Sequence, residues 1–478
     1  MESIGERGTT IQEFYRGASV LITGETGFMG KVLVEKLLRS CPHLSSVYLL
    51  VRSKKGKDAE SRLDDLFNDP LFGNLQDQMP KFRHKVTAIS GDCSMPGLGL
   101  IPSDRNLLTE EVSFVFHGAA TVRFDEKLRI AMGTNVAGTE NVLELAHDMK
   151  KLKAVIHIST AYCNCHLQEI QEKFYSYPLT YQKLSAFMDG VNDKMVDAIT
   201  PHLLGEWPNT YAFTKAMAED LVRDKGLGLP IGVFRPAIVV ATRDEPVSGW
   251  IDNLYGPTGV VVGAATGLIK TLHGDAGVNA DIVPVDMAVN AVIVSAWEVA
   301  NKPRAHTADE IPLYNYVSSV QKPLTWGQFM DKVSRYGIHV PTVRTVWCYS
   351  FTLNKHRSLH LMYVLFLHFL PAFIIDGVTM LFGNKPKLVK IYKKINKFCS
   401  VLSYFGNREW KFTNNNIQGL WEKLNENDKK LFDFDIDGLD WDNYFYKYVR
   451  GIRIYLMKDD LSTVPQGLAR QKRYINIL

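Results

Sequence analysis

A tyrosine and a lysine stand four residues apart in the segment NTYAFTKAMAED, at Tyr211 and Lys215. The segment has the pattern of a helix, on which this spacing places both side chains on one face. An ammonium group close to a phenol favours the phenolate, so the pair predicts a lowered tyrosine pKa and a usable proton donor or acceptor. The same spacing also occurs on solvated helix faces, so the prediction depends on what lies beside the pair.

Two hydroxyl side chains end the strand-like segment AVIHIST, at Ser159 and Thr160. We expect both at the carboxyl edge of a parallel sheet, which is where open α/β folds bind their ligands. A hydroxyl group in that place would hydrogen-bond a substrate carbonyl. Together with the tyrosine and the lysine, it predicts acid/base chemistry on a carbonyl compound.

A glycine-rich turn indicates the cofactor. In VLITGETGFMGKVLVEKLL an apolar strand is followed by three glycines at three-residue intervals and then by a helix pattern. This arrangement suits a dinucleotide, because the first glycine permits a tight turn, the second admits the pyrophosphate and the third allows close helix packing. An ordinary strand-to-helix turn is the alternative. The residues we assign to cofactor binding in this turn are Thr23, Gly24, Thr26, Gly27, Phe28, Met29 and Gly30.

The end of the next predicted strand indicates which dinucleotide binds. Proteins that hold the ribose of NAD place a carboxylate there. This chain has Arg52, Lys54 and Lys55 instead, with no acid before Asp58. Cations at that edge would pair with a 2′-phosphate, and a guanidinium does so with two hydrogen bonds. The sequence therefore favours NADPH, and a solvated lysine loop is the alternative.

The elements that would position these residues follow an alternating pattern. Six short β-branched runs are separated by longer amphipathic segments, which predicts a doubly wound parallel sheet of the Rossmann type. From about Gly249 the pattern is irregular and predicts loops and short elements. Near residue 350 the composition changes, so we expect a reductase domain over residues 1–350 and a smaller, mostly helical domain over residues 351–478. The six predicted strands are SVLIT, SVYLLVR, VTAISGD, VSFVFHGA, AVIHIST and IGVFRPA.

Composition narrows the class of protein. The chain has 478 residues, of which 46% are hydrophobic and 22% charged, and its net charge is +4. These values fit a folded globular protein and argue against one that coats nucleic acid. The six cysteines are scattered without the paired spacing of a disulfide framework or a zinc site, so we expect free thiols and no metal.

Seven motifs in unbroken order resemble the extended short-chain dehydrogenase/reductases. They are TGETGFMG, SGD, HGAA, TNVAGT, ISTAY, YAFTK and FRPAIV. The resemblance implies that Tyr211 is the acid/base and that Lys215 also holds the nicotinamide ribose. It further implies that Asp92 and Ala119 lie against the adenosine half of the cofactor, and that Arg235 and Pro236 lie beside the nicotinamide. From the TNVAGT motif we add Asn135 to the cofactor-binding residues.

More narrowly, GKVLVEKLLRSCP, VYLLVRSKKG, GWIDNLYGPTG and a long C-terminal segment are similar to the alcohol-forming fatty acyl-CoA reductases of animals. This resemblance covers nearly the whole chain. It implies that NADPH reduces a long-chain acyl-CoA to an aldehyde and then to the primary alcohol, with Thr160 and Tyr211 stabilising the oxyanion. Of the two hydroxyls we expect Thr160 to be catalytic, with Ser159 as the alternative. One departure is Glu25, whose carboxylate beside a pyrophosphate would weaken cofactor binding unless it points outward.

Two other functions stay open at this point. One is a reductase that stops at the aldehyde, because both reactions use the same three residues. The other is a nucleotide-sensing or lipid-binding scaffold without catalysis, although a scaffold has no need of Thr160, Tyr211 and Lys215 together.

An apolar segment from Leu359 to Gly383 has the length of a membrane span but contains His368, Pro371 and Asp376. These residues favour a helical hairpin over a span. The segment that follows, KPKLVKIYKKINKFCSVL, reads as a basic amphipathic helix that would lie on anionic lipid, or else as a solvated face. We therefore expect a membrane-associated protein that faces the cytosol, at the endoplasmic reticulum or the peroxisome. A homodimer is left open.

Overall fold

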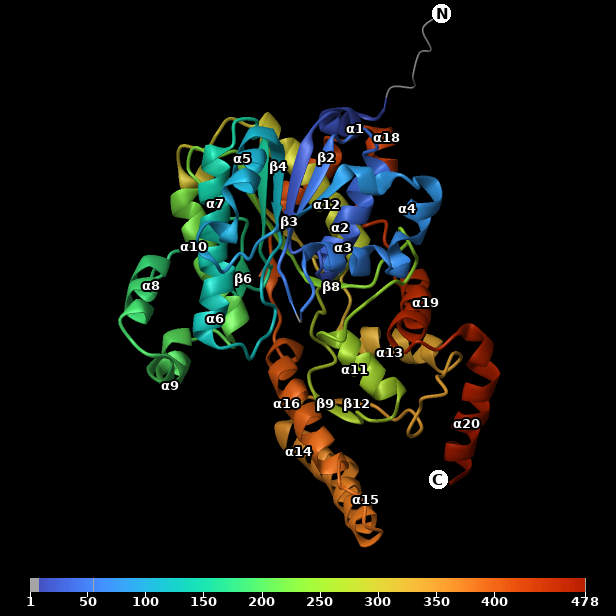
Figure 1. Ribbon diagram of the computed structural model, residues 1–478. Coiled ribbons are helices and arrows are strands. Elements are labelled where there is room, and N and C mark those ends of the chain that lie inside the picture. The colour runs from blue at the N-terminus through green and yellow to red at the C-terminus, as the bar shows by residue number, and fades with distance from the viewer. Residues whose placement is uncertain (1–7, 55, 478) are drawn as a thin grey trace, which may run out of the picture.

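A seven-stranded sheet forms the centre of the computed structural model, which describes residues 8–54 and 56–477 (Figure 1). Every neighbouring pair of strands in this sheet is parallel. In spatial order the strands are β11 (Leu313–Tyr316), β7 (Ile231–Pro236), β5 (Ala154–Ile158), β4 (Val112–His117), β1 (Ser19–Thr23), β2 (Ser46–Val51) and β3 (Val86–Ser90). All six predicted strands are present, which confirms the doubly wound fold. The seventh, β11, lies in the segment expected to be irregular.

Alternation of side chains along the strands builds two separate cores. Val20 and Ile22 of β1 belong to one apolar cluster, whereas Leu21 between them belongs to the other. Successive side chains of a strand point to opposite faces, so both faces of this sheet are apolar and each must be covered. One face is covered mainly by α2 (Phe28–Ser40), α3 (Ala59–Phe67) and α12 (Val285–Asn301), and the other by α5 (Pro102–Glu111), α7 (Gly138–Asp148) and α10 (Thr210–Lys225).

Further helices and three short strand pairs lie around the central sheet and below it in Figure 1. The helices are α1 (Thr10–Tyr15), α4 (Gly73–Gln78), α6 (Leu128–Met132), α8 (Tyr181–Asp189), α9 (Asp193–Leu204), α11 (Pro257–Ala265) and α13 (Trp326–Gly337). Three two-stranded pairs are β8 (Ile238–Val240) with β10 (Ile282–Pro284), β9 (Thr271–His273) with β12 (Thr352–Asn354), and β6 (Glu169–Ile170) with β13 (Lys411–Phe412). Two of these pairs join segments far apart in the sequence, so the later part of the chain folds back on the earlier part.

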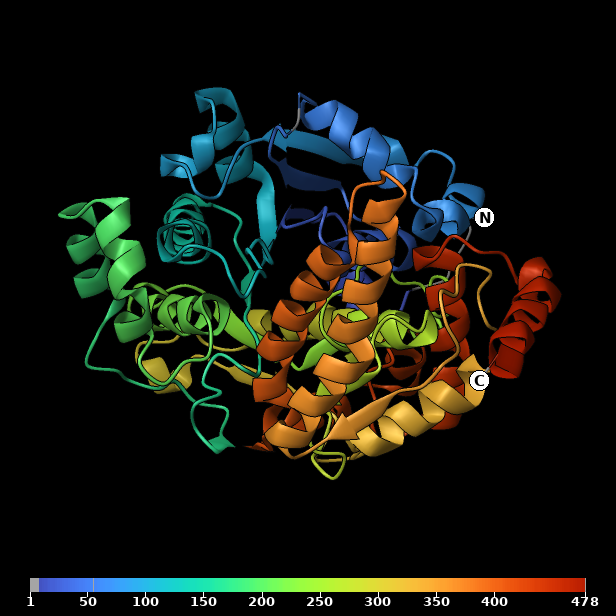
Figure 2. The ribbon, with the colours of Figure 1, turned by 90° about the horizontal axis from the view of Figure 1, so that it is seen from below.

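The helices beyond residue 350 divide into two groups. Those that pack back toward the sheet are α17 (Asn415–Glu422), α18 (Glu426–Leu431) and α19 (Trp441–Gly451), while α20 (Val464–Ile477) lies at the C-terminal end. The other group projects from the body as a helical hairpin (Figures 1 and 2). It consists of α14 (Arg357–Tyr363), a π-helical stretch (Val364–Phe369), α15 (Leu370–Leu381) and the returning α16 (Leu388–Gly406).

The first limb of the hairpin is one helical run, Arg357–Leu381, that is long and apolar enough to cross a membrane. Its chain direction reverses after Leu381, and α15 packs against α16. Pro371 lies in the first turn of α15, directly after the π-helical stretch, where its missing N–H does little harm. The sequence predicted a hairpin within Leu359–Gly383, but this segment forms one continuous limb, and α16 supplies the second limb.

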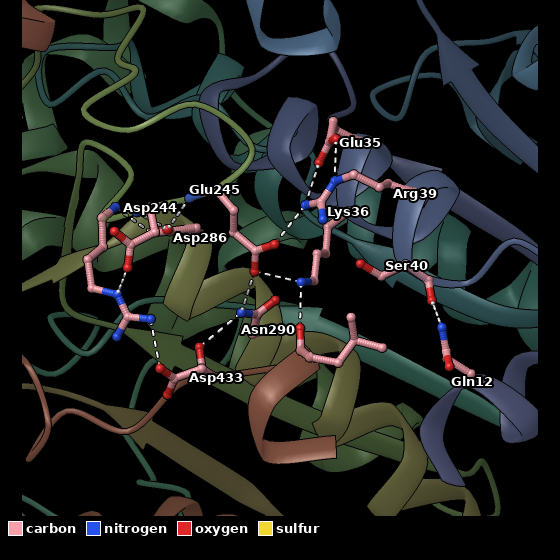
Figure 3. A network of polar contacts seen from close by, with 12 residues as sticks. Gln12, Glu35, Lys36, Arg39, Ser40, Asp244, Glu245, Asp286, Asn290 and Asp433 are labelled. Carbon is pink, nitrogen blue, oxygen red and sulfur yellow. Dashed lines mark hydrogen bonds and ion pairs between the residues drawn. The ribbon is translucent and has the colours of Figure 1, made fainter. Parts of the chain in front are cut away.

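A buried polar network ties α2 to the last third of the chain (Figure 3). Lys36, only 2% exposed, donates to Glu245 at 2.5 Å and to the Leu431 carbonyl at 2.6 Å. Arg39 also pairs with Glu245, at 2.7 Å. Burial opposes the charge of Glu245, but Lys36 and Arg39 outweigh it and lower the pKa of this carboxyl to about 2. The network therefore holds the C-terminal helices on the same face as the glycine turn's helix.

Two backbones cross without side chains between them, at Gly249 and Gly451. A Cβ atom placed on Gly451 would lie 1.7 Å from the Gly249 carbonyl oxygen, and Gly249 itself has a positive φ of 71°. No other residue type fits either position without moving α19. The loop after residue 249 is thus fixed in place by a helix that lies some two hundred residues later in the chain.

Candidate active site

Tyr211 and Lys215 lie in the first two turns of α10, at the carboxyl end of β5. Asn209 caps this helix by accepting from the Ala212 N–H at 2.8 Å, which fixes where the helix begins. Lys215 is buried and donates to the Ile158 carbonyl at 2.7 Å. Since Ile158 is the last residue of β5, this hydrogen bond places the lysine beside the two hydroxyl residues that follow the strand.

The two hydroxyl groups have different partners. Ser159 donates to Glu219 at 2.5 Å, and Glu219 also forms a buried ion pair with Arg235 at 2.6 Å. The Thr160 hydroxyl instead lies against the phenol of Tyr211 and accepts from the Tyr162 N–H at 3.3 Å. Ser159 is thus committed to a buried network, while Thr160 is positioned to act with the tyrosine.

The pKa values differ from the sequence expectation for Tyr211. Burial raises the pKa of this tyrosine above its ordinary value, and the Thr160 hydroxyl offsets only part of the rise. Burial also lowers the pKa of Lys215 to about 8, although Glu219 opposes this. The prediction of a lowered tyrosine pKa was wrong for this structure, because Lys215 directs its ammonium to the Ile158 carbonyl and the phenol is largely enclosed. The phenol is therefore held in its protonated, donating form.

The glycine turn has the geometry that a dinucleotide requires. Gly24 has a φ of 82°, and a Cβ there would lie 2.7 Å from the backbone of Gly118. A Cβ on Gly30 would lie 2.1 Å from the Gly24 carbonyl oxygen. No side chain of the described residues caps the N-terminus of α2 after Gly27, so the first N–H groups of this helix, which have no partner within the helix, suit an anion. A nicotinamide dinucleotide fits this turn.

A chain of buried polar contacts links the glycine turn to α10. The Thr23 hydroxyl contacts His117 Nδ1 at 2.8 Å, and His117 Nε2 contacts Thr139 at 3.0 Å. Thr139 donates to the Asn135 carbonyl at 2.7 Å, and the Asn135 side chain donates to Thr214 at 2.9 Å. Burial lowers the pKa of His117 to about 3, so the ring is neutral. Thr23 and Asn135 thus position the glycine turn and α10 relative to each other. Thr23 also accepts from the Ala119 N–H at 3.1 Å.

The structure describes two of the three cations expected at the end of β2 and adds a further arginine near them. Arg52 lies 3.5 Å from Asp92, and both are partly exposed. Lys54 is exposed, and Lys55 lies outside the described residues. Sequence reasoning missed Arg62, which reaches back from α3 to donate to the Thr26 hydroxyl at 3.1 Å and to the Arg52 carbonyl. The only sequence signal for Arg62 was its place about ten residues after the cationic strand end.

Glu25 points inward, whereas the sequence analysis required an outward orientation if its carboxylate was not to weaken cofactor binding. Its side chain is only 2% exposed, and in the described part of the chain its Oε2 atom has no hydrogen-bond partner. Burial raises the pKa of this carboxyl to about 7, while Arg62 opposes the rise. The glycine turn therefore encloses a carboxyl group whose charged form is disfavoured by burial.

The arginine and proline that end β7 have separate roles. Arg235 is fully buried and donates to Glu219 and to the Gln171 and Lys173 carbonyls, so it is a structural ion pair rather than a group free to touch a cofactor. Pro236 lies at the carboxyl edge, where its carbonyl accepts from the Ala161 N–H at 2.9 Å. Pro236 is thus next to the strand end that carries Thr160.

A cavity of about 820 Å³ opens beside the start of α2. The GWIDNLYGPTG segment lines much of it, together with Lys31, Phe398 and residues after α19. Trp250 stacks on Phe28 at 5.5 Å and donates to Asp69 at 3.1 Å, while Asp252 pairs with Lys31 at 3.0 Å. These contacts give Trp250 and Asp252, which the sequence left without roles, a place in the cavity wall.

Comparison with known proteins agrees with this geometry. Residues 22–292 and residues 367–459 each match a family described as male sterility protein. The reductase domain of a nonribosomal peptide synthetase from Mycobacterium tuberculosis superposes with a TM-score of 0.61 and 18% identity, over 94% of this chain and 93% of that one. The terminal reductase domain of the myxalamid biosynthetic pathway superposes with a TM-score of 0.59 and 16% identity, over 92% of this chain and 91% of that one. These solved structures share the fold of this chain, and the family match over residues 22–292 together with the glycine turn defines a Rossmann-type protein that binds a nicotinamide cofactor.

The relatives in sequence narrow the class. "Fatty acyl-CoA reductase wat" of Drosophila melanogaster is 43% identical over 97% of this chain and 89% of its own length. "Fatty acyl-CoA reductase 1" of Homo sapiens is 36% identical over 98% and 90%. This chain belongs to the fatty acyl-CoA reductase family, as the motifs in its sequence predicted.

Proposed function

We propose that this protein reduces long-chain fatty acyl-CoA to the primary alcohol with two molecules of NADPH, releasing CoA. The observation that carries the proposal is the gathering of Thr160, Tyr211 and Lys215 at the carboxyl end of β5, with Lys215 bonded to the last carbonyl of that strand. Membership of the fatty acyl-CoA reductase family supports the substrate class.

The residues of the chain would act on the substrate carbonyl in both steps. NADPH, when bound, supplies a hydride to the carbonyl carbon of the thioester and, in a second round, of the aldehyde. Thr160 and Tyr211 donate hydrogen bonds to the oxygen that gains negative charge, a contribution of about 10²–10³ in rate for each such donor. The first reduction gives a hemithioacetal that expels CoA, and Tyr211 then protonates the alkoxide of the second. The Lys215 charge stabilises both.

We assign NADPH rather than NADH on charge. Arg52, Lys54 and Arg62 gather near the end of β2 and the turn, where the 2′-phosphate of a bound cofactor lies in this fold. Replacing Arg52 and Arg62 by leucine should raise KM for NADPH at least tenfold and leave KM for NADH nearly unchanged. Equal loss with both cofactors would contradict the assignment. The residues we propose to hold the cofactor are Thr23, Gly24, Thr26, Gly27, Phe28, Met29, Gly30, Arg52, Lys54, Asp92, Ala119, Asn135 and Pro236.

The test is the ratio of NADPH consumed to product formed with palmitoyl-CoA. We expect two NADPH per hexadecanol, with turnover lost in Tyr211→Phe but kept in Tyr446→Phe, an exposed tyrosine far along the chain. One NADPH per aldehyde would instead establish the reductase that stops at that stage. Tight NADPH binding without turnover at any chain length would favour the scaffold.

We also propose that residues 1–350 form the NADP-binding reductase domain and residues 351–478 the C-terminal helical domain of the fatty acyl-CoA reductases. The protein would associate with a membrane surface and face the cytosol, at the endoplasmic reticulum or the peroxisome. The exposed apolar helical run Arg357–Leu381 supports membrane contact. Imaging of the tagged protein against markers of the two organelles tests the location, and light scattering tests whether it forms the homodimer that the sequence left open.

A further inference from the structure

The projecting hairpin of α14, α15 and α16 exposes more apolar surface than packing requires. On α15 five apolar residues at spacings of three, one, four and three lie along one helix face and are 45–86% exposed. We call this face the apolar stripe, and its members are Leu370, Phe373, Ile374, Val378 and Leu381. An exposed apolar patch of this kind marks a surface that contacts another protein or a membrane.

The charge around the stripe indicates what covers it. Between Asp376 and Glu409 the sequence has no acidic residue, but it has six lysines. Five of them, which we call the lysine row, have no acidic partner within 4 Å in the described part of the chain. They are Lys385, Lys387, Lys390, Lys393 and Lys394. A surface that is apolar on one helix and uniformly basic on its neighbour complements anionic lipid, whose acyl chains and phosphates lie side by side.

The hairpin is held in a form that cannot cross a bilayer. The buried carboxylate of Asp376 accepts from the N–H groups of Lys387, Leu388 and Val389 at 2.9–3.0 Å. It therefore caps α16 and fixes the reversal of the chain. On the inner side, His368 accepts from the Lys270 N–H at 3.0 Å, so the first limb is docked on the body up to that point. Of the first limb, only α15 extends past this docking point, and its 12 residues span about 18 Å, well short of a bilayer core of about 30 Å.

The inner end of α16 reaches the candidate active site. Phe405 lies 5.7 Å from Phe124, and Phe124 stacks on Tyr211 at 5.8 Å. Lys397 pairs with Asp125 at 2.8 Å, which holds α16 against the loop that carries Phe124. One helix thus runs from the apolar stripe to the aromatic residues around the tyrosine.

We propose that the hairpin lies in the surface of an anionic bilayer, with the apolar stripe sunk into the acyl boundary and the lysine row on the phosphates, and that it brings acyl chains from that leaflet along α16 to Tyr211. The second half of this inference rests on the proposed function, and the first half does not. In this arrangement long acyl chains reach the site without passing through water.

The first experiment measures binding to vesicles of phosphatidylcholine with and without phosphatidylserine. The wild type should bind the anionic vesicles at least tenfold more tightly. Ile374→Glu combined with Leu381→Glu should reduce that binding at least tenfold. Lys390→Glu combined with Lys394→Glu should remove the preference for phosphatidylserine. The control is Ile101→Glu, an equally exposed apolar residue beside α5 at the opposite end of the molecule, and it should bind as the wild type (Figure 1).

A second measurement reports how deeply the hairpin enters the bilayer and leaves the charges of the stripe and the lysine row unchanged. All six native cysteines are buried, so Phe382→Cys beside the stripe carries a polarity-sensitive dye selectively. Its emission should shift to the blue on vesicle binding, and an unchanged spectrum would contradict insertion. Wild-type binding by the Ile374→Glu and Leu381→Glu variant, or a dimer that this variant dissolves, would overturn the bilayer as the partner.

Kinetics separate the two halves of the inference. With water-soluble hexanoyl-CoA the stripe variant should turn over like the wild type, whereas with palmitoyl-CoA in anionic vesicles it should lose at least tenfold. Equal rates on both substrates would overturn the acyl route while vesicle binding stands. If the wild type oxidises NADPH with neither substrate, the proposed function fails, and the vesicle measurements still decide the membrane contact.

Discussion

The Lys215 ammonium donates to the Ile158 carbonyl over 2.7 Å, which ties the second turn of α10 to the last residue of β5. Four residues before the lysine stands Tyr211, and two residues after the strand stands Thr160. This one hydrogen bond therefore sets the relative positions of all three groups that would act on a substrate carbonyl.

The lysine should give the reaction its upper pH limit. Burial lowers the pKa of Lys215 to about 8, so the ammonium is present below that pH and is lost above it. We expect kcat/KM to fall about tenfold per pH unit above pH 8. Lys215→Arg, which stays charged, should lower the rate but abolish this fall. A wild-type profile that stays flat well above pH 8 would show that the charge of Lys215 is not required.

Substitution of the two adjacent hydroxyl residues should have different effects, on the catalytic rate for Thr160 and on the stability for Ser159. Thr160→Val removes a donor beside Tyr211 and should cost about 10² in kcat with little change in unfolding. Ser159→Ala removes a donor to the buried Glu219 and should cost about 1–2 kcal/mol of stability while kcat changes little. Steady-state rates and denaturant unfolding of both variants check this. The reverse pattern would make Ser159 the catalytic hydroxyl.

Glu25 should make cofactor binding depend on proton uptake. Below pH 7 its buried carboxyl is neutral, and above pH 7 it is an anion inside the turn that takes the pyrophosphate. Burial raises the pKa of the neighbouring Cys93 thiol to about 12, so this group does not titrate near neutrality. Kd for NADPH, followed by its fluorescence, should therefore rise about tenfold from pH 6 to pH 8.

Glu25→Gln is the control for that prediction. It should bind NADPH about equally at both pH values and at pH 8 more tightly than the wild type. Because titration of the cofactor's own phosphate affects both proteins alike, only the difference between them reports on Glu25. Parallel pH profiles would exclude a role for this carboxyl.

The network in Figure 3 should matter for stability rather than for rate. Lys36→Met leaves Glu245 with one cation fewer and should cost about 3 kcal/mol in unfolding free energy at neutral pH. Lys57→Met, which breaks an exposed pair with Asp65, should cost less than about 1 kcal/mol. Equal losses would contradict the importance of burial.

The same network predicts how acid acts. The Lys36 and Arg39 charges lower the pKa of Glu245 to about 2, below its ordinary value near 4.5. The stabilisation from this group is therefore complete above pH 4.5 and is lost as the pH falls toward 2. Urea unfolding of the wild type and of Lys36→Met through this range should show the difference between them shrinking.

The strands and the glycine turn could be predicted because their signals are local. Short β-branched runs such as VLIT and the spacing of Gly24, Gly27 and Gly30 determine their own conformation. The missed elements lack such signals. Helix α12 is buried on nearly all sides, so its sequence has no polar face to mark a helical period. Strand β11 has only four residues and forms beside β7, some eighty residues earlier.

Several features of the candidate site could not be predicted from the sequence for the same reason. The Tyr211–Lys215 spacing predicted a shared helix face, but burial by other segments raises the tyrosine pKa, and the Lys215 ammonium donates to the Ile158 carbonyl. The orientation of Glu25 depends on the space left beneath the turn, and Arg62 reaches the turn only because α3 folds back over it. Contacts between distant segments decide these features, and a single sequence does not encode them in any local pattern.

The crossing of Gly249 and Gly451 has a consequence for the order in which the protein takes shape on the ribosome. Strands β1 to β5 and the glycine turn emerge first, but one face of their sheet is covered only when α12 has been made, and Lys36 of α2 then still lacks the Leu431 carbonyl. The loop that follows Gly249 and lines the cavity cannot take its final position until α19 has been made, because Gly249 packs against Gly451 of that helix. A nascent chain that has not yet reached α19 would therefore have this cavity without its finished wall.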